Sequence, residues 1–208
     1  VAEARPLVLF VCHWKSKLGG EDNTEGLRRA AARVAARRLE EIALEDPSIP
    51  VLIIGDLNEN HDEFYRRGGS FLSALLPDDP DAAALAETAR AGTAFEGGLV
   101  PVQDFLVLSG EKPPVARYFT PGTLALYSPW DRELEAGSFY YKENWETIDH
   151  LLMNGAFFDG SGWEFEGCRV LDQAPFTNST GQPSAYKPYN GNGLSDHLPL
   201  LLTLKRIN

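Results

Sequence analysis

The apolar residues of this chain form two short continuous runs and, between them, one long run with helical spacing. Leu7–Cys12 and Val51–Ile54 are continuous, which is typical of central strands that are buried on both faces. Residues 24–46 have one apolar helical face, made of Leu27, Ala31, Val34, Ala35, Leu39 and Ile42. Pro47 and Pro50 end this helix. The order strand, helix, strand predicts a right-handed βαβ unit with parallel strands.

The arginines of the expected helix lie mostly on its opposite face. They are Arg28, Arg29, Arg33, Arg37 and Arg38. We interpret them as a solvated face rather than as a patch that binds nucleic acid, because charged residues usually occupy the outer side of an amphipathic helix.

The second half of the chain has shorter patterns. Residues 62–76 have helical character interrupted by Gly68-Gly69, and residues 81–91 predict a short Ala-rich helix. Residues 92–102 and 175–193 read as irregular segments. Further strands are expected at 105–108, within 118–130, and at 147–153, 163–171 and 200–205.

Length and composition fit one domain that spans residues 1–208. The net charge of -11 argues against a broad electrostatic grip on nucleic acid, and it is compatible with binding of divalent cations. No apolar run reaches the length of a transmembrane segment. Cys12 and Cys168 do not make a disulfide framework, and a single bridge stays open.

Polar residues that could take part in catalysis or binding stand at the ends of the expected strands. Asp56 and Asn58 follow Gly55, which permits a turn, and in extended geometry their side chains leave on the same face. His13 follows the first strand, Asp149 lies within another, and Asp196-His197 precede the last. Singly, each has a structural explanation, such as a satisfied core histidine or an Asx turn. Together they supply two imidazoles, three carboxylates and one amide, the groups needed for metal-assisted attack of water on a phosphorus ester.

Four motifs in this order resemble the endonuclease/exonuclease/phosphatase superfamily, whose fold is that of deoxyribonuclease I. They are His13-Trp14-Lys15-Ser16, Gly55-Asp56-Leu57-Asn58, Ile148-Asp149-His150 and Ser195-Asp196-His197-Leu198-Pro199. The resemblance runs from about Leu7 to Leu204. It implies an α/β fold, a layered sandwich of two packed mixed β-sheets flanked by helices.

The resemblance also implies roles for individual residues in a hydrolase of phosphate esters. Asp56 matches the aspartate that activates water, and Asn58 matches the asparagine that holds the water and the phosphate. His13 and His197 match phosphate-contacting histidines, and Asp149 matches the carboxylate that orients His197.

The implied cofactor is Mg²⁺ (or Mn²⁺), with Asp196 and Asp56 beside it. The family's principal metal-binding glutamate has no match here, since neither Glu3 nor Glu59 lies in the corresponding motif. We therefore expect the chain to correspond to the C-terminal part of such an enzyme. We also expect its N-terminal segment, as a separate or unrecorded chain, to be a partner.

Substrates on this fold include nucleic acid, phosphoinositides, phospholipid headgroups and sugar phosphates. The rival hypothesis is a catalytically inactive phosphate-binding domain that lacks the main metal ligand. A weaker one is a zinc enzyme that uses His13, His150 and His197, although His150 should point away from Asp149 across the strand. Some aromatic residues could stack on a base, but packing is favoured for most: Tyr140, Tyr141, Trp145, Tyr186 and Tyr189.

Overall fold

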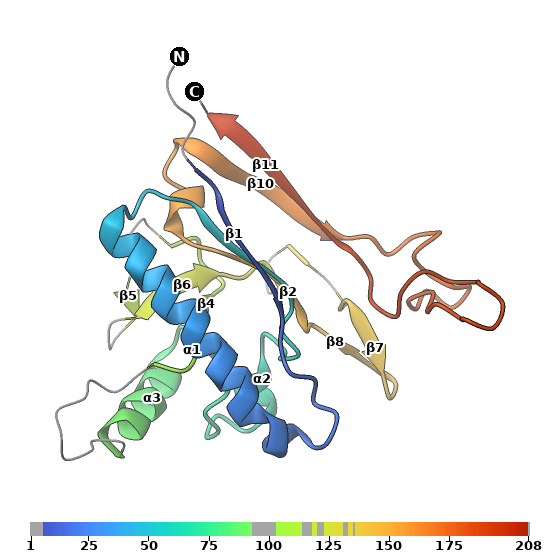
Figure 1. Ribbon diagram of the computed structural model, residues 1–208, viewed down its shortest axis with the longest axis horizontal. Helices are drawn as coiled ribbons and strands as arrows, with labels where there is room; N and C mark the ends of the chain where they lie inside the picture. The colour runs from blue at the N-terminus through green and yellow to red at the C-terminus, as the bar shows by residue number, and fades with distance from the viewer. Residues whose placement is uncertain are drawn as a thin grey trace.

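The centre of the molecule is a mixed β-sheet. The computed structural model describes residues 6–92, 103–113, 118–119, 123–130, 133–134 and 136–207. Within these ranges the strand order is β1-β2-β9-β6-β4-β3, and β5 pairs with β6 (Figure 1). The strands are β1 (Val8–His13), β2 (Val51–Asp56), β3 (Leu75–Pro77), β4 (Leu106–Ser109), β5 (Tyr118–Phe119), β6 (Thr123–Tyr127) and β9 (Asp149–Met153).

The first two strands and helix α1 (Glu21–Glu45) form the expected βαβ unit. Strands β1 and β2 are parallel, with Val8 opposite Val51 and His13 opposite Asp56. Strand β9 then runs antiparallel to β2, which makes the sheet mixed. The order of the sheet therefore brings residues 149–153 beside a strand that ends about a hundred positions earlier.

Strand β1 lies at the edge of the sheet, so the prediction of a central strand at Leu7–Cys12 was wrong. Among the described residues β1 pairs with β2 alone. Its residues alternate between half-buried and exposed, and Val11 is 75% exposed. The continuous apolar run indicated burial on both faces of β1. One of its two faces is exposed instead, the one that carries Val11.

Helix α1 packs on the sheet through a face rotated from the one that we predicted. Its buried apolar residues are Ala32, Ala35, Ala36, Leu39 and Ile42. Leu27 and Val34 are exposed, whereas Arg28 is fully buried. The interpretation of a solvated arginine face is therefore wrong for Arg28, because buried carboxylates of Glu25 and Glu59 pair with it.

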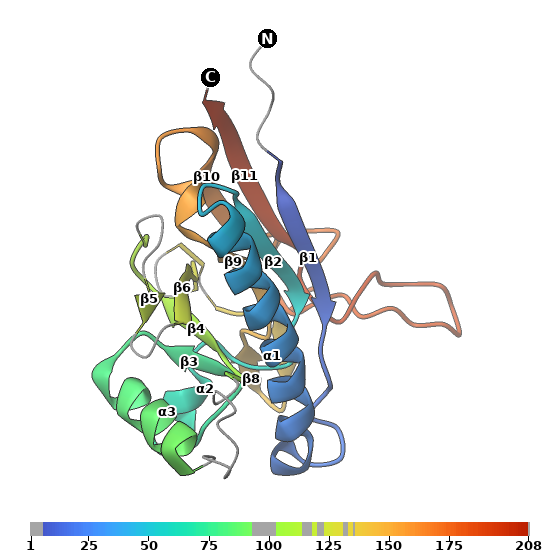
Figure 2. The ribbon, with the colours of Figure 1, turned by 60° about the vertical axis from the view of Figure 1, so that its left-hand side comes forward.

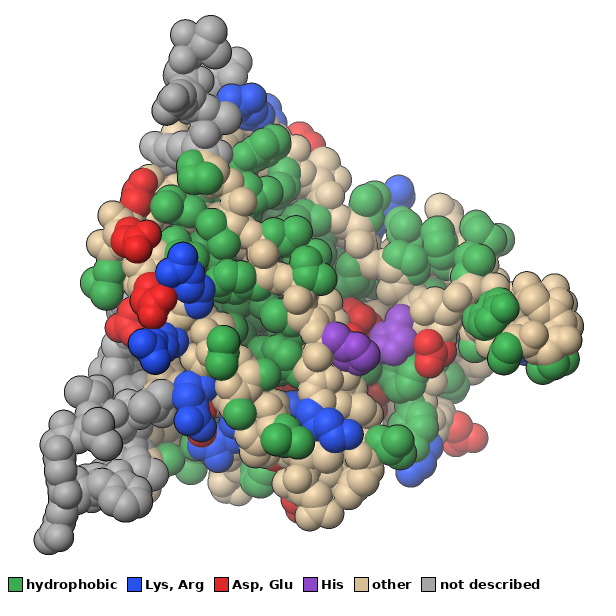
Figure 3. Space-filling model, in the orientation of Figure 1, with side chains coloured by type: hydrophobic (Ala, Val, Ile, Leu, Met, Phe, Trp, Pro, Cys, Tyr) green, Lys and Arg blue, Asp and Glu red, His purple; other side chains and the backbone are tan. Residues whose placement is uncertain are grey.

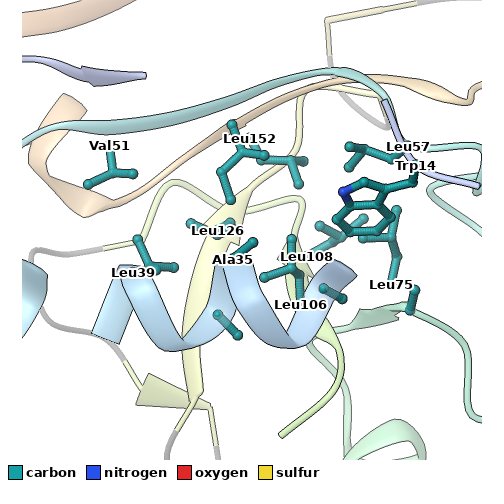
Figure 4. Packing of buried hydrophobic residues seen from close by; sticks show 14 of the residues in the cluster. Trp14, Ala35, Leu39, Val51, Leu57, Leu75, Leu106, Leu108, Leu126 and Leu152 are labelled. Atoms are coloured by element: carbon teal, nitrogen blue, oxygen red, sulfur yellow. The ribbon is translucent and has the colours of Figure 1, made fainter. Parts of the chain in front are cut away.

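Two layers cover the two faces of the sheet. Helix α1 covers one face, where Trp14, Leu57 and Leu152 belong to the same apolar cluster as Leu39 (Figure 4). The antiparallel strands β10 (Gly162–Val170) and β11 (Leu200–Ile207) form the opposite layer (Figure 2). There Phe165 packs with residues of the sheet such as Leu52 and Met153. The arrangement is a layered α/β sandwich of the deoxyribonuclease I-like type, as expected.

The remaining elements are short. They are α2 (Glu63–Arg66), α3 (Pro80–Gly92), a 3₁₀ turn (Gly155–Phe157) and the hairpin of β7 (Phe139–Tyr141) and β8 (Asn144–Glu146). Only four residues of the helical stretch expected at 62–76 form a helix, since positive φ angles at Gly68 and Gly69 end it. The expectation for 92–102 falls mostly outside the described residues. None of the helices in the described ranges has the length and apolarity of a membrane crossing.

Candidate active site

Three neighbouring strands bring three of the predicted residues into one row. His13 is opposite Asp56 in the β1–β2 register, and Asp56 is opposite Asp149 in the β2–β9 register. His13 Nε2 lies 3.6 Å from Asp56 Oδ2. An imidazole and two carboxylates therefore stand side by side at one end of the sheet, although they are distant in sequence.

His197 joins this row through a hydrogen bond. Its Nδ1 donates to Asp149 Oδ2 at 2.7 Å, and the hydroxyl of Ser138 donates to the same oxygen at 2.5 Å. The ring of His197 also stacks on Phe139, with centroids 4.7 Å apart. These contacts fix the orientation of the imidazole and leave Nε2 as the ring nitrogen that can contact a ligand.

The loop after β2 has a tight geometry. The backbone N–H of Asn58 donates to Asp56 Oδ1 at 2.8 Å, which is an Asx turn, and Asn58 has a φ of 52°. Our assumption of extended geometry across Asp56 and Asn58 was therefore wrong. Both side chains still line one cleft, because the turn folds Asn58 back and its amide donates to the Trp14 carbonyl.

Gly55 allows β1 and β2 to meet just before this turn. Its φ is 119°, and a Cβ at this position would lie 2.1 Å from the carbonyl oxygen of Cys12. A side chain cannot be accommodated there without moving the strands apart. Gly55 thus holds Asp56 in register with His13.

Burial and neighbouring charges change the acidity of the two central groups. Burial raises the pKa of Asp56, and the charge of Asp149 raises it further against the opposing effects of Asn58, His197 and His13. Burial lowers the pKa of His197, but its hydrogen bond with Asp149 and nearby negative charges outweigh burial, so this pKa is raised. A carboxylate with raised basicity therefore lies near an imidazole that retains its proton more readily.

Five of the predicted residues line a cleft of about 880 Å³. His13, Asp56, Asn58, Asp196 and His197 are all on its wall. Histidine side chains are visible together on the surface, beside acidic side chains (Figure 3). The volume is in the range of small-molecule sites.

A hydrogen-bonded network that we did not predict supports this cleft. Asn60 accepts from the backbone N–H of Thr147 at 2.8 Å and donates to Glu146 at 2.5 Å and to Glu63 at 3.2 Å. Glu63 also pairs with Lys17 at 2.6 Å. The polar residues Asn58 to Asn60 were the only sign of this network in the sequence. The other members of the network are scattered over 130 residues of the sequence, from Lys17 to Thr147.

Two buried side chains, those of Arg28 and His150, hold the same loop from the interior of the protein. Arg28 Nε donates to Glu59 Oε2 at 2.5 Å, with both side chains fully buried. His150 Nε2 donates to the Glu59 carbonyl at 2.8 Å. His150 is thus a buried support of the loop, separate from Asp149 and from the cleft, which removes it from the zinc alternative.

The described residues offer only part of a metal site. No group of three or more His, Cys, Asp or Glu side chains in the described ranges is arranged to hold a metal ion. Asp56 and Asp196 are carboxylates on the cleft wall. They match Mg²⁺ in kind, because Mg²⁺ is commonly held by one or two carboxylates together with water and substrate phosphate.

Fold and cleft together define a deoxyribonuclease I-like α/β protein with a row of acidic and imidazole groups at one end of its sheet. Residues 3–70 match the model of the endonuclease/exonuclease/phosphatase family. The matched segment contains His13, Asp56 and Asn58 and agrees with the resemblance at the first two of the four motifs. No curated protein and no solved structure gave a significant match to the chain.

Proposed function

We propose that this protein hydrolyses phosphate esters in the cleft that contains Asp56 and His197. The observation that carries the proposal is the continuous row from His13 through Asp56 and Asp149 to His197. The family match supports a phosphoesterase or nuclease type of hydrolase at the level of the superfamily.

The proposed roles follow from the contacts of each group. Asp56, which lines the cleft, accepts a proton from the attacking water. His197 donates from Nε2 to a phosphate oxygen, while Asp149 holds the ring through Nδ1. Asn58, with one amide N–H bound to Trp14, can contact the water or the phosphate, and the exposed ring of His13 can contact a further phosphate oxygen.

We propose Mg²⁺ or Mn²⁺ as the cofactor, held by Asp56 and Asp196. A bound divalent cation would neutralise negative charge on the phosphate. The protein groups described above would bind the ester and move the proton at Asp56.

We also propose that further polypeptide covers the exposed side of β1 and adds a carboxylate to the cleft. In the described part of the chain β1 pairs with β2 alone, and the side chains of Leu9 and Val11 are exposed; both support the proposal, since such surfaces favour association. Light scattering and intact mass of the purified protein test it. A soluble, monomeric single species of 22.9 kDa would contradict it.

Hydrolysis of bis(p-nitrophenyl) phosphate in Mg²⁺ or Mn²⁺, compared with EDTA, tests the proposed activity. We expect metal-dependent release of nitrophenol that His197→Ala abolishes. The alternative is a phosphate-binding domain without catalysis, since in the described ranges Asp56 and Asp196 are not joined by a third ligand in a metal-holding group. That alternative predicts binding of inorganic phosphate, seen by NMR shifts of the His197 ring, without turnover in any metal.

A further inference from the structure

The hairpin of β7 and β8 forms one wall of the cleft. Its cross-strand pairs are Phe139 with Glu146 and Tyr141 with Asn144, and all four residues line the cleft. Tyr140 and Trp145 form the intervening pair and contact each other edge to face. Because side chains alternate along a strand, the hairpin turns Phe139 and Tyr141 into the cleft and Tyr140 and Trp145 away from it.

The cleft-facing rings form a stack that begins at His197. Phe139 lies 4.7 Å from the His197 ring, and Tyr141 lies 6.0 Å from Phe139 with an interplanar angle of 14°. Tyr141 is 53% exposed at the outer end. A large aromatic side chain therefore stands open in the cleft, two ring spacings from the proposed phosphate site.

The turn of the hairpin adds a cation to this wall. Lys142 and Glu143 are the two central residues, with φ angles of 46° and 67°, in a turn that usually favours Asn-Gly. Lys142 Nζ lies 5.1 Å from the centroid of Tyr141. A lysine on a flexible stem can move aside for a planar group and contact its phosphate.

The other basic groups of the cleft are already paired. Lys17 is bound to Glu21 and Glu63, Arg66 is bound to Asp62 and Glu146, and Arg67 is bound to Asp22. A headgroup that carries several phosphates would need several free cations, which this wall does not offer. A ligand with one phosphate per planar ring fits the stack and Lys142 better.

We propose that Tyr141 is a stacking subsite for a nucleobase and that the cleft takes single-stranded nucleic acid or a nucleotide ester. The proposal deepens the proposed function and rests on it for the position of the phosphate. Base stacking on an aromatic side chain tolerates any sequence, so the subsite selects for a base without reading which base it is. The acidic net charge of -11 agrees with a short single strand rather than a long duplex.

Binding without turnover tests the proposal. The probe is fluorescein-labelled hexathymidylate, measured by anisotropy in EDTA at low salt. The comparison probe has the same phosphates but abasic tetrahydrofuran residues in place of the thymidines. We expect the wild type to prefer the thymidylate, and Tyr141→Ala to remove that preference with a loss on the order of 10-fold or more.

Matched variants separate the ring from other effects. Tyr141→Phe should keep the preference, because it keeps the ring. Tyr189→Ala should also keep it, since Tyr189 is 81% exposed and is not among the cleft-lining residues. Equal affinity of the wild type for both probes, or an equal loss on both in Tyr141→Ala, would overturn the proposal. Binding only to phosphatidylcholine vesicles that contain phosphatidylinositol 4-phosphate would overturn it as well.

The outcome is separable from that of the proposed function. Base-dependent binding in a protein that never hydrolyses phosphodiesters would keep the stacking subsite and reject the hydrolase. Metal-dependent hydrolysis without any preference for base-containing probes would keep the hydrolase and reject the subsite.

Discussion

His197 Nδ1 donates to Asp149 Oδ2 at 2.7 Å across 48 residues of sequence. Asp149 is fixed by its place in β9, opposite Asp56, and His197 is fixed by its stack on Phe139. The pair therefore links β9, the neighbour of the strand that presents the proposed base Asp56, to the loop that presents the proposed phosphate ligand.

Asp149→Asn should lower phosphodiester hydrolysis by a factor on the order of 10² without unfolding the protein, because an amide cannot supply the negative charge that holds the imidazolium. Ser138→Ala is the graded control, since it removes one hydrogen bond to Asp149 but keeps the carboxylate. We expect it to cost roughly 10-fold or less. Full activity in Asp149→Asn would remove the pair from the mechanism.

Arg28→Met should destabilise the fold by about 3–5 kcal/mol, because it leaves Glu25 and Glu59 buried without their counter-charge. Arg37→Met on the same helix is the matched control. Arg37 is 80% exposed and its ion pair within the described part of the chain is with Glu41, so its loss should change the stability by about 0.5 kcal/mol or less. Urea unfolding of both variants measures the difference, and equal effects would contradict a structural role for the buried pair.

Gly55→Ala should cost about 3 kcal/mol or more, since the added Cβ meets the Cys12 carbonyl and φ is positive. Gly26→Ala tests the opposite case. Gly26 lies in α1 with open space around it, so alanine should raise stability by about 0.5–1 kcal/mol. Thermal unfolding decides both, and a neutral Gly55→Ala would show that β1 and β2 can separate at this point.

His150 should make the protein sensitive to acid. Burial lowers its pKa to about 4, against a hydrogen bond to the Glu59 carbonyl that raises it, and none of the described residues is a hydrogen-bond partner for Nδ1. Between these two pKa values the unfolded state binds a proton at His150 that the folded state does not bind. The free energy of unfolding therefore falls as the pH drops from about 6.5 towards 4. His150→Gln keeps a donor for Glu59 but cannot titrate. Its unfolding free energy should fall less steeply over this window, and parallel curves for the two proteins would contradict the assignment.

The order of elements was accessible from the sequence because periodicity is a local property. The βαβ unit, the helix at 80–92 and the late strands follow from runs of apolar residues, and the match over residues 3–70 agrees with the early motifs. The loop at Asp56 was also recognisable, since glycine and short polar side chains mark a turn.

What escaped the sequence depends on distant partners. The burial of Arg28 requires Glu59, which is 31 positions away, and no helical pattern contains that information. The edge position of β1 depends on which strands pair with it, and among the described strands only β2 does. The aromatic residues Tyr140, Tyr141 and Trp145 stand close together in the sequence, but only the folded hairpin tells which of them line the cleft.

The most direct test of the central claim compares kcat/KM of the wild type and Asp56→Asn for bis(p-nitrophenyl) phosphate in Mn²⁺. Asp56 is the residue around which the row of groups is arranged, and asparagine keeps its size while removing the base. We predict a loss on the order of 10²–10⁴ in kcat/KM, with unchanged circular dichroism and melting temperature. A folded Asp56→Asn protein with the activity of the wild type would contradict the account.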